Sequence, residues 1–465
     1  MATFDVIVLG GGPAGYVCAI RAAQLGFSTA VVEKDKLGGV CVNIGCIPTK
    51  ALLHSAYALN LLSHDAKALG IDLEGPVKGN YGVAMKRSRQ VSEQNSKGVE
   101  FLMKKNKITV LKGLGVLQPG KKVQVGAEVH EAKKAVVIAT GSRVKGIPQI
   151  GLEINKTTVI SSDEALFLEQ APATLAIIGA GAVGSEFADI FNAFGSKITL
   201  IEALPRILPI EDAEASDVVT KSYRKRGIAV LAGAKVQKAT VGAKEVTLEV
   251  EAGGKTEKVA VEKVLMAAGR AVNTEGMGFK ECGVQLTERG FVKVNPATLE
   301  TTAAGVYCIG DVAGPPMLAH KGMREGVFVA ELLAGQHPHP IKYDNVPSVT
   351  YCHPEVASIG LTEDQAKEKK IDYQVGRFPM SANGRARASM ETEGFVKIIR
   401  EKQYGEILGA HIVASHASEM IHELVVAREN EYTVEEVDLA IHAHPTLSEA
   451  IAQAGLDSMG RAIDF

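Results

Sequence analysis

Two cysteines near the start of the chain are spaced for redox chemistry. Cys41 and Cys46 lie in the segment GGVCVNIGCIPTK, residues 38–50. If the chain folds back between them, their sulfur atoms can close a small disulfide ring, although closing so short a loop adds little stability. The spacing differs from the C-x2-C pattern of metal sites and thioredoxins. A bond that stabilises little is better explained by redox work, and two reduced cysteines in the core are the alternative.

A histidine and a glutamate near the other end of the chain are spaced for proton transfer. His444 and Glu449 belong to the segment HAHPTLSE, in which Pro445 can place the histidine in a turn before a helix. A carboxylate bonded to one imidazole nitrogen fixes the tautomer and makes the other nitrogen a better base for a thiol. One alternative is a histidine that caps the helix. A metal site shared with His442 is weaker, because no third ligand is evident, so we expect none.

The elements that would position these residues begin with an internal repeat. The apolar runs Phe4–Leu9 and Leu175–Ile178 each lead into a G-x-G-x-x-G turn, a helix and a second apolar run that ends in an acid. Five positions match at one constant offset: Gly10, Gly12, Gly15, Gly26 and Glu33 recur as Gly179, Gly181, Gly184, Gly195 and Glu202. Matches at one offset indicate a structural repeat.

Each copy of the repeat predicts a dinucleotide-binding unit. The first glycine permits a tight turn, the second lets a pyrophosphate approach the backbone, and the third lets the helix pack on the strand. The helix N-terminus offers N–H groups to the phosphates, and the acid can hold ribose hydroxyls. A single such motif is often a plain glycine turn, but here the whole context occurs twice. Two dinucleotide sites in one chain suggest a flavin and a nicotinamide, which exchange hydride.

The second copy favours NAD over NADP. Glu202 ends its second strand, and a carboxylate at this position would repel a 2′-phosphate. Ala203, Leu204 and Pro205 follow, so no pair of basic residues stands next to the acid. Arg206 is the one feature nearby that speaks for NADP.

Later segments complete the two copies. Apolar strands at 134–139 and 263–268 end at Gly141 and Gly269. The interval from Gly10 to Gly141 is longer than the interval from Gly179 to Gly269, so the first copy carries an insertion, and this longer interval holds both cysteines. A further buried strand within 300–311 ends in Asp311, an acid suited to hydroxyls of a flavin.

The pattern changes after the Pro-interrupted segment 337–340. Residues 395–400 and 406–413 predict a hairpin, and helical stretches follow at 417–428 and 447–459. The predicted fold class is therefore α/β, with two Rossmann-like domains, one nested in the other, followed by an α+β domain from residue 346 to the end.

Composition excludes several classes of protein. Lys and Arg total 51 against 53 Asp and Glu, which argues against nucleic acid and membrane surfaces as partners. No apolar run approaches the roughly 18 residues of a membrane span. Six cysteines are too few for a secreted disulfide scaffold, so we expect Cys18, Cys282, Cys308 and Cys352 to be core residues. The first strand begins too early for a targeting peptide, so a cytoplasmic chain, or one already trimmed, is expected.

Taken together, the chain resembles the pyridine nucleotide–disulfide oxidoreductases over essentially its whole length. The resemblance rests on residues 10–15, 41–50, 179–186, 305–311 and 444–449. Within the family, residues 48–53, 317–320 and 444–449 look most like the branch that oxidises dihydrolipoamide. One departure is Val272, where the family often has proline, and it bears only on the stiffness of a loop.

The resemblance implies a domain order and two cofactors. It implies an FAD-binding domain at 1–146 and 275–345, an NAD-binding domain at 147–274 and a dimerisation domain at 346–465. FAD would be held by Gly10, Gly12, Gly15, Glu33, Lys50, Gly113, Gly141, Asp311 and Ala319. NAD would be held by Gly179, Gly181, Gly184, Glu202, Val236 and Gly269. Lys50 and Glu186 would form an ion pair beside the reactive flavin nitrogen, and two ordinary helix-surface charges are the alternative.

The resemblance also implies a mechanism. His444, oriented by Glu449, would take a proton from dihydrolipoamide carried on an acyltransferase or on a glycine-cleavage carrier protein. Cys41 would exchange with the substrate sulfur, and Cys46 would stand on the flavin side, from which electrons pass through FAD to NAD. In the family the histidine of one subunit faces the disulfide of the other, so a homodimer would be obligatory.

Two other functions remain open at this point. One is another NAD(P)H-dependent disulfide reductase, acting on glutathione, a related thiol or mercuric ion. Glu202 counts against the NADPH-using glutathione type, and the end of the sequence shows no cysteine pair of the mercuric type. The other is a docking subunit of a 2-oxoacid dehydrogenase complex without turnover of its own, against which the intact cysteines and the His444–Glu449 pair argue.

Overall fold

The computed structural model describes residues 2–464, which divide into two units. The first unit consists of residues up to 51, 83–145 and 269–341, and the second of 52–82, 146–268 and those from 342 onward. The first unit thus takes in most of the predicted FAD-binding segments. The second takes in most of the predicted NAD-binding segment and the C-terminal domain. The exact domain boundaries predicted from the sequence stay predictions.

A seven-stranded sheet forms the centre of the first unit. Strand β1 (Thr3–Leu9) pairs in parallel with β2 (Thr29–Glu33) and with β6 (Glu128–Ile138). Both faces of β1 are covered, which is why its residues are almost all apolar. The other strands are β3 (Thr109–Lys112) beside β2, β17 (Val306–Cys308) beside β6, and β4 (Gly115–Gln118) and β5 (Lys122–Val125), which continue the sheet beyond β6.

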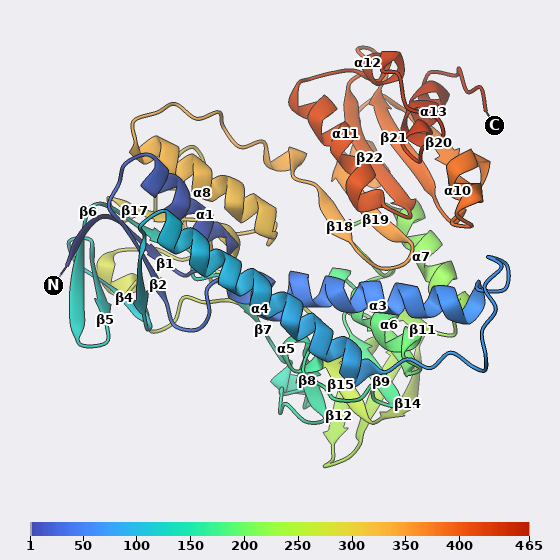
Figure 1. Ribbon diagram of the computed structural model, residues 1–465, viewed down its shortest axis with the longest axis horizontal. Helices are drawn as coiled ribbons and strands as arrows, with labels where there is room; N and C mark the ends of the chain where they lie inside the picture. The colour runs from blue at the N-terminus through green and yellow to red at the C-terminus, as the bar shows by residue number, and fades with distance from the viewer. Residues whose placement is uncertain (1, 465) are drawn as a thin grey trace. The chain divides into compact units, whose positions relative to one another are not determined.

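Two helices that are distant in sequence pack together in the first unit. Helix α1 (Pro13–Gln24) follows β1, and α8 (Ala319–Leu333) lies alongside it (Figure 1). A Cβ at Gly326 of α8 would lie 2.7 Å from the carbonyl oxygen of Ala14. Glycine therefore permits the close approach of the two helices. Strands β7 (Ser142–Val144) and β16 (Arg270–Val272) form a separate antiparallel pair in this unit.

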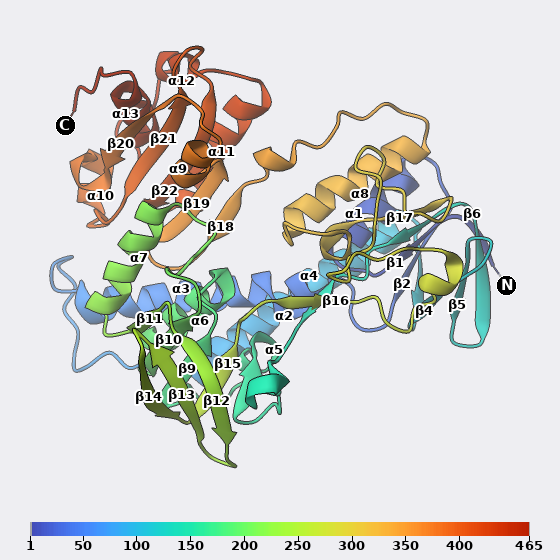
Figure 2. The same ribbon diagram turned by 180° about the vertical axis from the view of Figure 1, so that it is seen from behind.

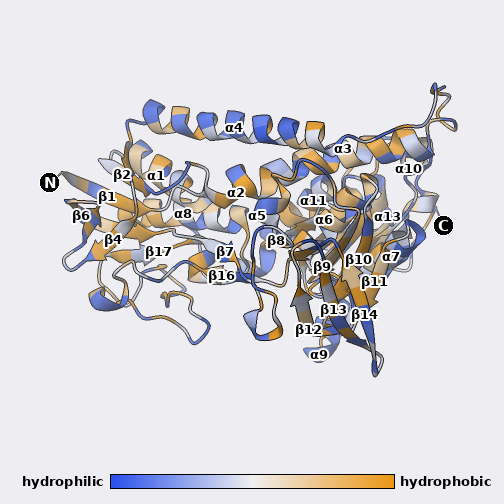
Figure 3. Ribbon diagram, turned by 90° about the horizontal axis from the view of Figure 1, so that it is seen from below, coloured by the Kyte–Doolittle hydropathy of each residue, from blue (hydrophilic) through white to orange (hydrophobic). Residues whose placement is uncertain are grey.

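The extra length of the first copy contains three helices, α2 (Gly39–Ile44), α3 (Cys46–His64) and α4 (Tyr81–Lys105). Figure 3 shows that hydrophobic and hydrophilic residues alternate along α4. Six of its buried side chains recur every three or four positions, which is the spacing of one helix face: Ala84, Ser88, Ser92, Ser96, Val99 and Met103. The serines on this face become important for the cysteine segment described below.

The second copy of the repeat forms a parallel five-stranded sheet in the order β11-β10-β9-β15-β8. Strands β9 (Thr174–Ile178) and β10 (Lys197–Glu202) are joined by α6 (Ala182–Ala193), as the repeat predicts. Figure 2 shows this sheet together with the antiparallel strands that follow it. The remaining elements are β8 (Val159–Ser161), α5 (Ser162–Ala165), α7 (Ala213–Lys225), β11 (Ala229–Ala232), β12 (Lys235–Val241), β13 (Val246–Ala252), β14 (Lys255–Val261) and β15 (Lys263–Met266).

The C-terminal part of the second unit is an antiparallel sheet in the order β18-β19-β22-β21-β20. Helix α11 (Ala417–Glu429) packs on β19 and β22, and α13 (Glu449–Ser458) packs on β20 and β21 (Figure 1). The predicted α+β region and its hairpin are confirmed. The strands are β18 (Ser348–Thr350), β19 (Glu355–Gly360), β20 (Tyr373–Pro379), β21 (Phe395–Glu401) and β22 (Ile407–Ala414), with short helices α9 (Glu363–Glu368), α10 (Gly384–Ala388) and α12 (Val434–Leu439).

Three expectations about local structure need correction. The apolar run at 134–139 is only the end of β6, because antiparallel pairing with β5 already begins at Glu128. Within 300–311 only Val306–Cys308 is a strand, since the residues before it form turns and isolated bridges. Cys282 is only half-buried and packs against the edge of the core, because it ends a short surface turn, whereas the other three scattered cysteines are buried.

Within residues 2–464, no helix combines the length and the apolar character needed to cross a membrane.

Candidate active site

The first glycine turn needs glycine at two of its three motif positions. Gly10 has a φ of +111°, and a Cβ at Gly15 would lie 1.9 Å from the carbonyl oxygen of Gly10. Gly12 is different, since the nearest atom to a Cβ built there would be the Cα of Gly39 at 3.9 Å. Gly12 is also the N-cap of α1, which no side chain within the described range caps. The turn therefore offers open space and helix N–H groups to a phosphate.

The second glycine turn repeats this arrangement in the other unit. Gly179 has a φ of +97°, and a Cβ at Gly184 would lie 1.9 Å from the carbonyl oxygen of Gly179. A Cβ at Gly181 would have no atom of residues 2–464 within 4 Å, apart from its own chain neighbours. Gly181 is the N-cap of α6. Both turns therefore fit a pyrophosphate at the second glycine, in the space that a Cβ would fill.

The two acids at the strand ends are held against their turns. One carboxylate oxygen of Glu33 accepts a hydrogen bond from the N–H of Gly11 at 2.8 Å. One carboxylate oxygen of Glu202 accepts a hydrogen bond from the N–H of Ala180, also at 2.8 Å. Each acid thus stands at the edge of a turn, where a nucleotide ribose would lie if its pyrophosphate occupied the turn.

The structure gathers the remaining predicted flavin residues in the first unit. Gly113 follows β3, has a φ of +140° and donates its N–H to the carbonyl oxygen of Glu33 at 3.0 Å. Gly141 has a φ of +69° and follows β6. The Ser142 hydroxyl donates to Asp311 at 2.5 Å, and Ala319 is the first residue of α8.

An ion pair that the sequence analysis missed supports the segment around Asp311. Lys321 and Glu325 of α8 lie 3.2 Å apart, and both side chains are almost completely buried. Lys321 donates to the carbonyl oxygens of Gly310 and Gly314, while Glu325 accepts the N–H of Gly310. Buried charges persist where they are paired and hydrogen-bonded, so this pair fixes the short turn that carries the acid.

The cysteine segment is built directly onto the first glycine turn. Gly38 and Gly39 both have positive φ, at +95° and +57°, which lets the chain reverse after the second strand. The N–H of Gly38 donates to the carbonyl oxygen of Gly11 at 2.8 Å. A Cβ at Gly39 would lie 2.6 Å from the Cα of Gly12. Helix α2, which contains Cys41, therefore starts against the turn that would hold a pyrophosphate.

The structure brings the two predicted redox cysteines together. Their thiols are hydrogen-bonded to each other, and this bond, followed by burial, raises the pKa of Cys41, while the charge of Lys50 acts to lower it. Cys41 is half-buried and Cys46 is exposed. Cys46 is the first residue of α3, and the N-terminus of a helix stabilises a thiolate. The pair therefore has the proximity for thiol–disulfide exchange, and the start of α3 favours Cys46 as the thiolate.

Helix α4 holds the cysteine segment through its backbone. Ser92 donates to the carbonyl oxygen of Val42 at 2.8 Å, and Ser96 donates to that of Leu37 at 3.0 Å. Arg89 donates to a further carbonyl of the segment at 2.6 Å. These contacts were not predicted. The signal that could have revealed them is the row of small polar residues at four-residue spacing on the buried face of an amphipathic helix.

The predicted histidine–glutamate pair forms in the C-terminal domain. Nδ1 of His444 lies 2.8 Å from a carboxylate oxygen of Glu449, whose other oxygen accepts the N–H of Thr446 at 2.7 Å. Burial acts to raise the pKa of Glu449, but the hydrogen bonds from Thr446 and His444 outweigh it and lower the pKa. A carboxylate on Nδ1 leaves Nε2 to take a proton from a substrate.

Two large apolar side chains shortly before this histidine in the chain are exposed. The His444 side chain is 80% exposed, and Ile441 and Leu439 are 100% and 79% exposed. Large apolar side chains that stand clear of the surface in a group are typical of interfaces.

His442 is not shared with His444. Its Nε2 lies 2.7 Å from Glu423 of α11, and its Nδ1 lies 2.9 Å from the carbonyl oxygen of Ala440. Both ring nitrogens are therefore used in holding the loop. Over residues 2–464 the structure contains no group of three or more His, Cys, Asp or Glu side chains placed to bind a metal ion.

Some predicted site residues lie in different units. Lys50 belongs to the first unit and Glu186 to the second, so their pairing beside the flavin stays a prediction. Glu186 lies on α6, where its carboxylate accepts the N–H of Tyr351 at 3.1 Å. Val236 lies on β12, and Gly269, with a φ of +96°, follows β15. Their contacts with NAD also stay predictions.

The chain matches known families over most of its length. Residues 4–326 match the family described as pyridine nucleotide-disulphide oxidoreductase, and residues 346–455 match the dimerisation domain of the same family.

Several relatives found by sequence are named dihydrolipoyl dehydrogenase. Dihydrolipoyl dehydrogenase from Rhizobium etli is 43% identical and covers 99% of this chain and 99% of its own. That from Bacillus subtilis is 41% identical and covers 100% of both chains. Among solved structures, LpdA from Mycobacterium tuberculosis has a TM-score of 0.89 at 27% identity and covers 98% of this chain and 99% of its own. The HOCl-induced flavoprotein disulfide reductase RclA from Escherichia coli has a TM-score of 0.83 at 26% identity and covers 96% of this chain and 98% of its own.

Proposed function

The chain belongs to the pyridine nucleotide-disulphide oxidoreductases, and from this membership we propose that it oxidises dihydrolipoamide to lipoamide and reduces NAD. The observation that carries the proposal is the contact between the Cys41 and Cys46 thiols beside the first of two glycine turns. Relatives about 40% identical over their whole length are named for this activity.

The residues present fit both cofactors of the family. The space at Gly12, the N-terminus of α1 and the carboxylate of Glu33 suit FAD, together with Lys50, Gly113, Gly141, Asp311 and Ala319. The space at Gly181 and the carboxylate of Glu202 suit NAD, together with Val236 and Gly269. When bound, FAD accepts the electron pair of the reduced cysteines and NAD receives it as hydride.

The protein residues carry out thiol–disulfide exchange. His444 accepts the proton of a substrate thiol, and the resulting thiolate attacks the sulfur of Cys41. The bond between Cys41 and Cys46 breaks, and Cys46 leaves as a thiolate at the start of α3. The second substrate thiol then attacks the substrate sulfur bonded to Cys41, its proton passes to the departing Cys41 sulfur, and the lipoamide ring closes. Two electrons pass from the substrate to the two cysteines, so the exchange is balanced.

Glu449 is a positioning residue in this scheme. Its carboxylate holds Nδ1 of His444 and is itself fixed by the N–H of Thr446. The histidine therefore keeps one tautomer, with Nε2 turned to the substrate. The chain carries the dimerisation domain of the family and forms a homodimer. We place the cysteine pair of one subunit opposite His444 of the other, which agrees with the exposed apolar residues shortly before this histidine in the chain.

The substrate is proposed to arrive on a carrier protein. The names of the relatives support a dihydrolipoyl group as the substrate, and its attachment to an acyltransferase or to a glycine-cleavage carrier is what the family resemblance implies. The cytoplasmic location expected from the sequence stays a prediction.

The proposal is tested by anaerobic reduction of NAD with dihydrolipoamide, followed through NADH absorbance, with NADPH and oxidised glutathione run in parallel. We expect rapid NADH formation that falls about 10²- to 10⁴-fold in His444→Gln, because a positioned general base contributes about this much. His442→Gln is the matched control, since that histidine holds the same loop without facing a substrate, and it should keep most of the activity.

Three other results would contradict the proposed function or the role of His444. Glutathione reduction driven by NADPH, without NADH formation, would mean another disulfide reductase. Failure of both reactions in flavin-containing dimer would favour the docking subunit. Equal losses in both histidine variants would mean that the loop, and not the base, had been damaged.

A further inference from the structure

Arg206 is the one sequence feature near the NAD site that the proposed function leaves unexplained. It lies four residues after Glu202, on the loop that leaves β10, and a cation there would suit the 2′-phosphate of NADP. In the structure its guanidinium donates to Asp364 at 3.1 Å. The side chain that could recognise a 2′-phosphate is thus already paired.

The loop that carries Arg206 is fixed to the second glycine turn. Glu202 accepts a hydrogen bond from the N–H of Leu204 at 2.9 Å and another from the N–H of Ala180. Four residues on, the N–H of Leu208 donates to the carbonyl oxygen of the same Ala180 at 2.7 Å. The loop is therefore tethered to Ala180 on both sides of Arg206, through Glu202 on one side and directly through Leu208 on the other. The long side chain of Arg206 starts at the rim of the turn, and its direction is set by its partner.

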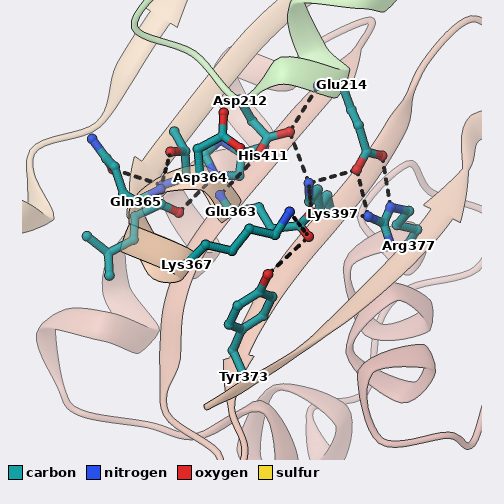
Figure 4. A network of polar contacts seen from close by, with 12 residues as sticks. Asp212, Glu214, Glu363, Asp364, Gln365, Lys367, Tyr373, Arg377, Lys397 and His411 are labelled. Atoms are coloured by element: carbon teal, nitrogen blue, oxygen red, sulfur yellow. Dashed lines mark hydrogen bonds and ion pairs between the residues drawn. The ribbon is translucent and has the colours of Figure 1, made fainter. Parts of the chain in front are cut away.

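The start of helix α9, which carries Asp364, is fixed by several hydrogen bonds. Asp364 is the second residue of α9, next to Glu363, and Figure 4 shows both residues within a network of polar contacts. The N–H of Glu363 donates to Asp212 at 3.1 Å, and the carboxylate of Glu363 accepts a hydrogen bond from the buried Lys397 at 2.7 Å. The start of α9 is also closed by a capping box in which Thr362 and Gln365 bond to each other's N–H groups.

We propose that Asp364 strengthens the preference for NAD over NADP by holding Arg206 away from the ribose edge of the second glycine turn. The inference rests on the proposed function, because it assigns the adenosine ribose to Glu202. In this arrangement Glu202 repels a 2′-phosphate, and Asp364 holds a cation, Arg206, that could compensate for the repulsion. Removal of Asp364 would free Arg206 to bind the phosphate, while the contacts to an unphosphorylated ribose would not change.

The effect is expected to be modest in the wild-type background. An exposed ion pair contributes about 0.2–1 kcal/mol, so its release corresponds to a change in affinity of no more than about fivefold. Glu202 still repels the phosphate in that background. Replacing Glu202 with glutamine removes this repulsion, and the contribution of Arg206 should then be measured more clearly.

The test is calorimetric titration of the flavin-containing dimer with 5′-AMP and with adenosine 2′,5′-bisphosphate. In the Glu202→Gln background, Asp364→Asn should tighten binding of the bisphosphate by up to about fivefold and leave the affinity for 5′-AMP unchanged. Adding Arg206→Gln should abolish the gain. Asp372→Asn is the matched control, because it removes a negative charge from another exposed pair, with Lys402, in the same unit.

The outcomes separate this inference from the proposed function. An unchanged affinity for the bisphosphate in Asp364→Asn, with normal binding of 5′-AMP, overturns the inference alone. A gain that persists without Arg206, or that Asp372→Asn reproduces, also overturns it, since the effect would then be one of net charge. Failure of wild-type protein to bind 5′-AMP at all would overturn the assignment of this turn to NAD as well.

Discussion

The two glycine turns have nearly the same backbone and differ in the segment that comes after the acid. Glu33 accepts hydrogen bonds from Gly11 and Asp35, and Glu202 accepts them from Ala180 and Leu204, which occupy the equivalent positions of the second copy. After Glu33 the chain turns at two glycines into the cysteine helix. After Glu202 it enters the loop that carries Arg206.

The difference shows how one repeated unit can take two roles. In both copies the turn, the helix N-terminus and the acid form a cradle for a dinucleotide. In the first copy the next segment places a thiol pair against the cradle, so electrons can enter there. In the second copy the next segment carries Arg206, paired with Asp364, and this is where we propose that the preference for NAD is strengthened. The repeat provides the binding, and the sequence after the acid provides the function.

The largest effect should come from the cysteine segment of the first copy. Cys46→Ser removes the leaving thiolate of the exchange, so dihydrolipoamide oxidation should fall about 10³-fold or more, as for other residues that act as a unit. NADH should still bleach the flavin absorbance, because the second cradle is intact. Stopped-flow spectroscopy measures both reactions on the same sample.

Cys282→Ser is the control for this loss. Cys282 is half-buried in the same unit but lies in a surface turn, so its variant should retain both reactions. If Cys46→Ser kept full dihydrolipoamide oxidation, the first copy would have no special role in electron entry, and the comparison of the two copies would fail.

The next effect should separate the two cradles by cofactor. Gly12 and Gly181 have φ of −71° and −73°, which alanine tolerates, and both border open space. Gly12→Ala should therefore fold but weaken FAD binding, whereas Gly181→Ala should keep its flavin and weaken NAD binding. A methyl group pressed against the pyrophosphate should cost about 1–3 kcal/mol, or roughly 5- to 150-fold in affinity.

Flavin absorbance after dialysis and titration with NAD measure these two losses. Gly98→Ala in α4 is the matched control, because a Cβ there meets no atom of the described chain within 4 Å, its own surroundings in the helix aside, and should affect neither cofactor. Loss of the same cofactor in both variants would contradict the assignment of one dinucleotide to each copy.

Sequence analysis could predict the parts of the site that depend on local geometry. The glycine turns follow from positive φ and close backbone approach, and the spacing of the motif reports both directly. The pairing of His444 with Glu449 was predictable for the same reason, because the two are close in the chain and face each other across one turn. The strands around the first glycine turn and the C-terminal hairpin followed from apolar runs and turn residues.

The supporting contacts were not predictable, since they join residues far apart in the chain. Ser92 bonds to Val42, and Lys397 bonds to Asp212, across long stretches of intervening sequence. Each of these contacts has only a weak signal in the sequence. Lys397 stands in the otherwise apolar run Val396–Ile399 of β21, and a lysine in a buried strand signals carboxylates around it. Spacing alone cannot say where those carboxylates come from.

The smallest effect should show that the second cradle depends on this distant network while the first does not. Burial acts to raise the pKa of Glu363, but hydrogen bonds from Lys397 and Lys367 outweigh it and lower the pKa from 4.5 to about 2. A carboxyl group whose folded pKa is depressed stabilises the fold above its unfolded pKa, and this contribution is lost as the pH falls from 4.5 towards 2.

Glu363→Gln should therefore lower the free energy of unfolding by about 1–3 kcal/mol at neutral pH, and the gap to wild type should narrow below pH 4.5. Urea unfolding at a series of pH values measures it. Glu93→Gln is the control, because Glu93 also has a lowered pKa, from its hydrogen bond with Lys36, but is exposed, so its variant should change the free energy of unfolding little.

Glu363 fixes the helix that presents Asp364 to Arg206. Its variant should therefore also loosen the discrimination against a 2′-phosphate, while flavin binding stays as in wild type. A gap that did not depend on pH would mean that Glu363 acts through packing, and equal weakening of both cradles would mean that the network supports the whole fold and not the second copy.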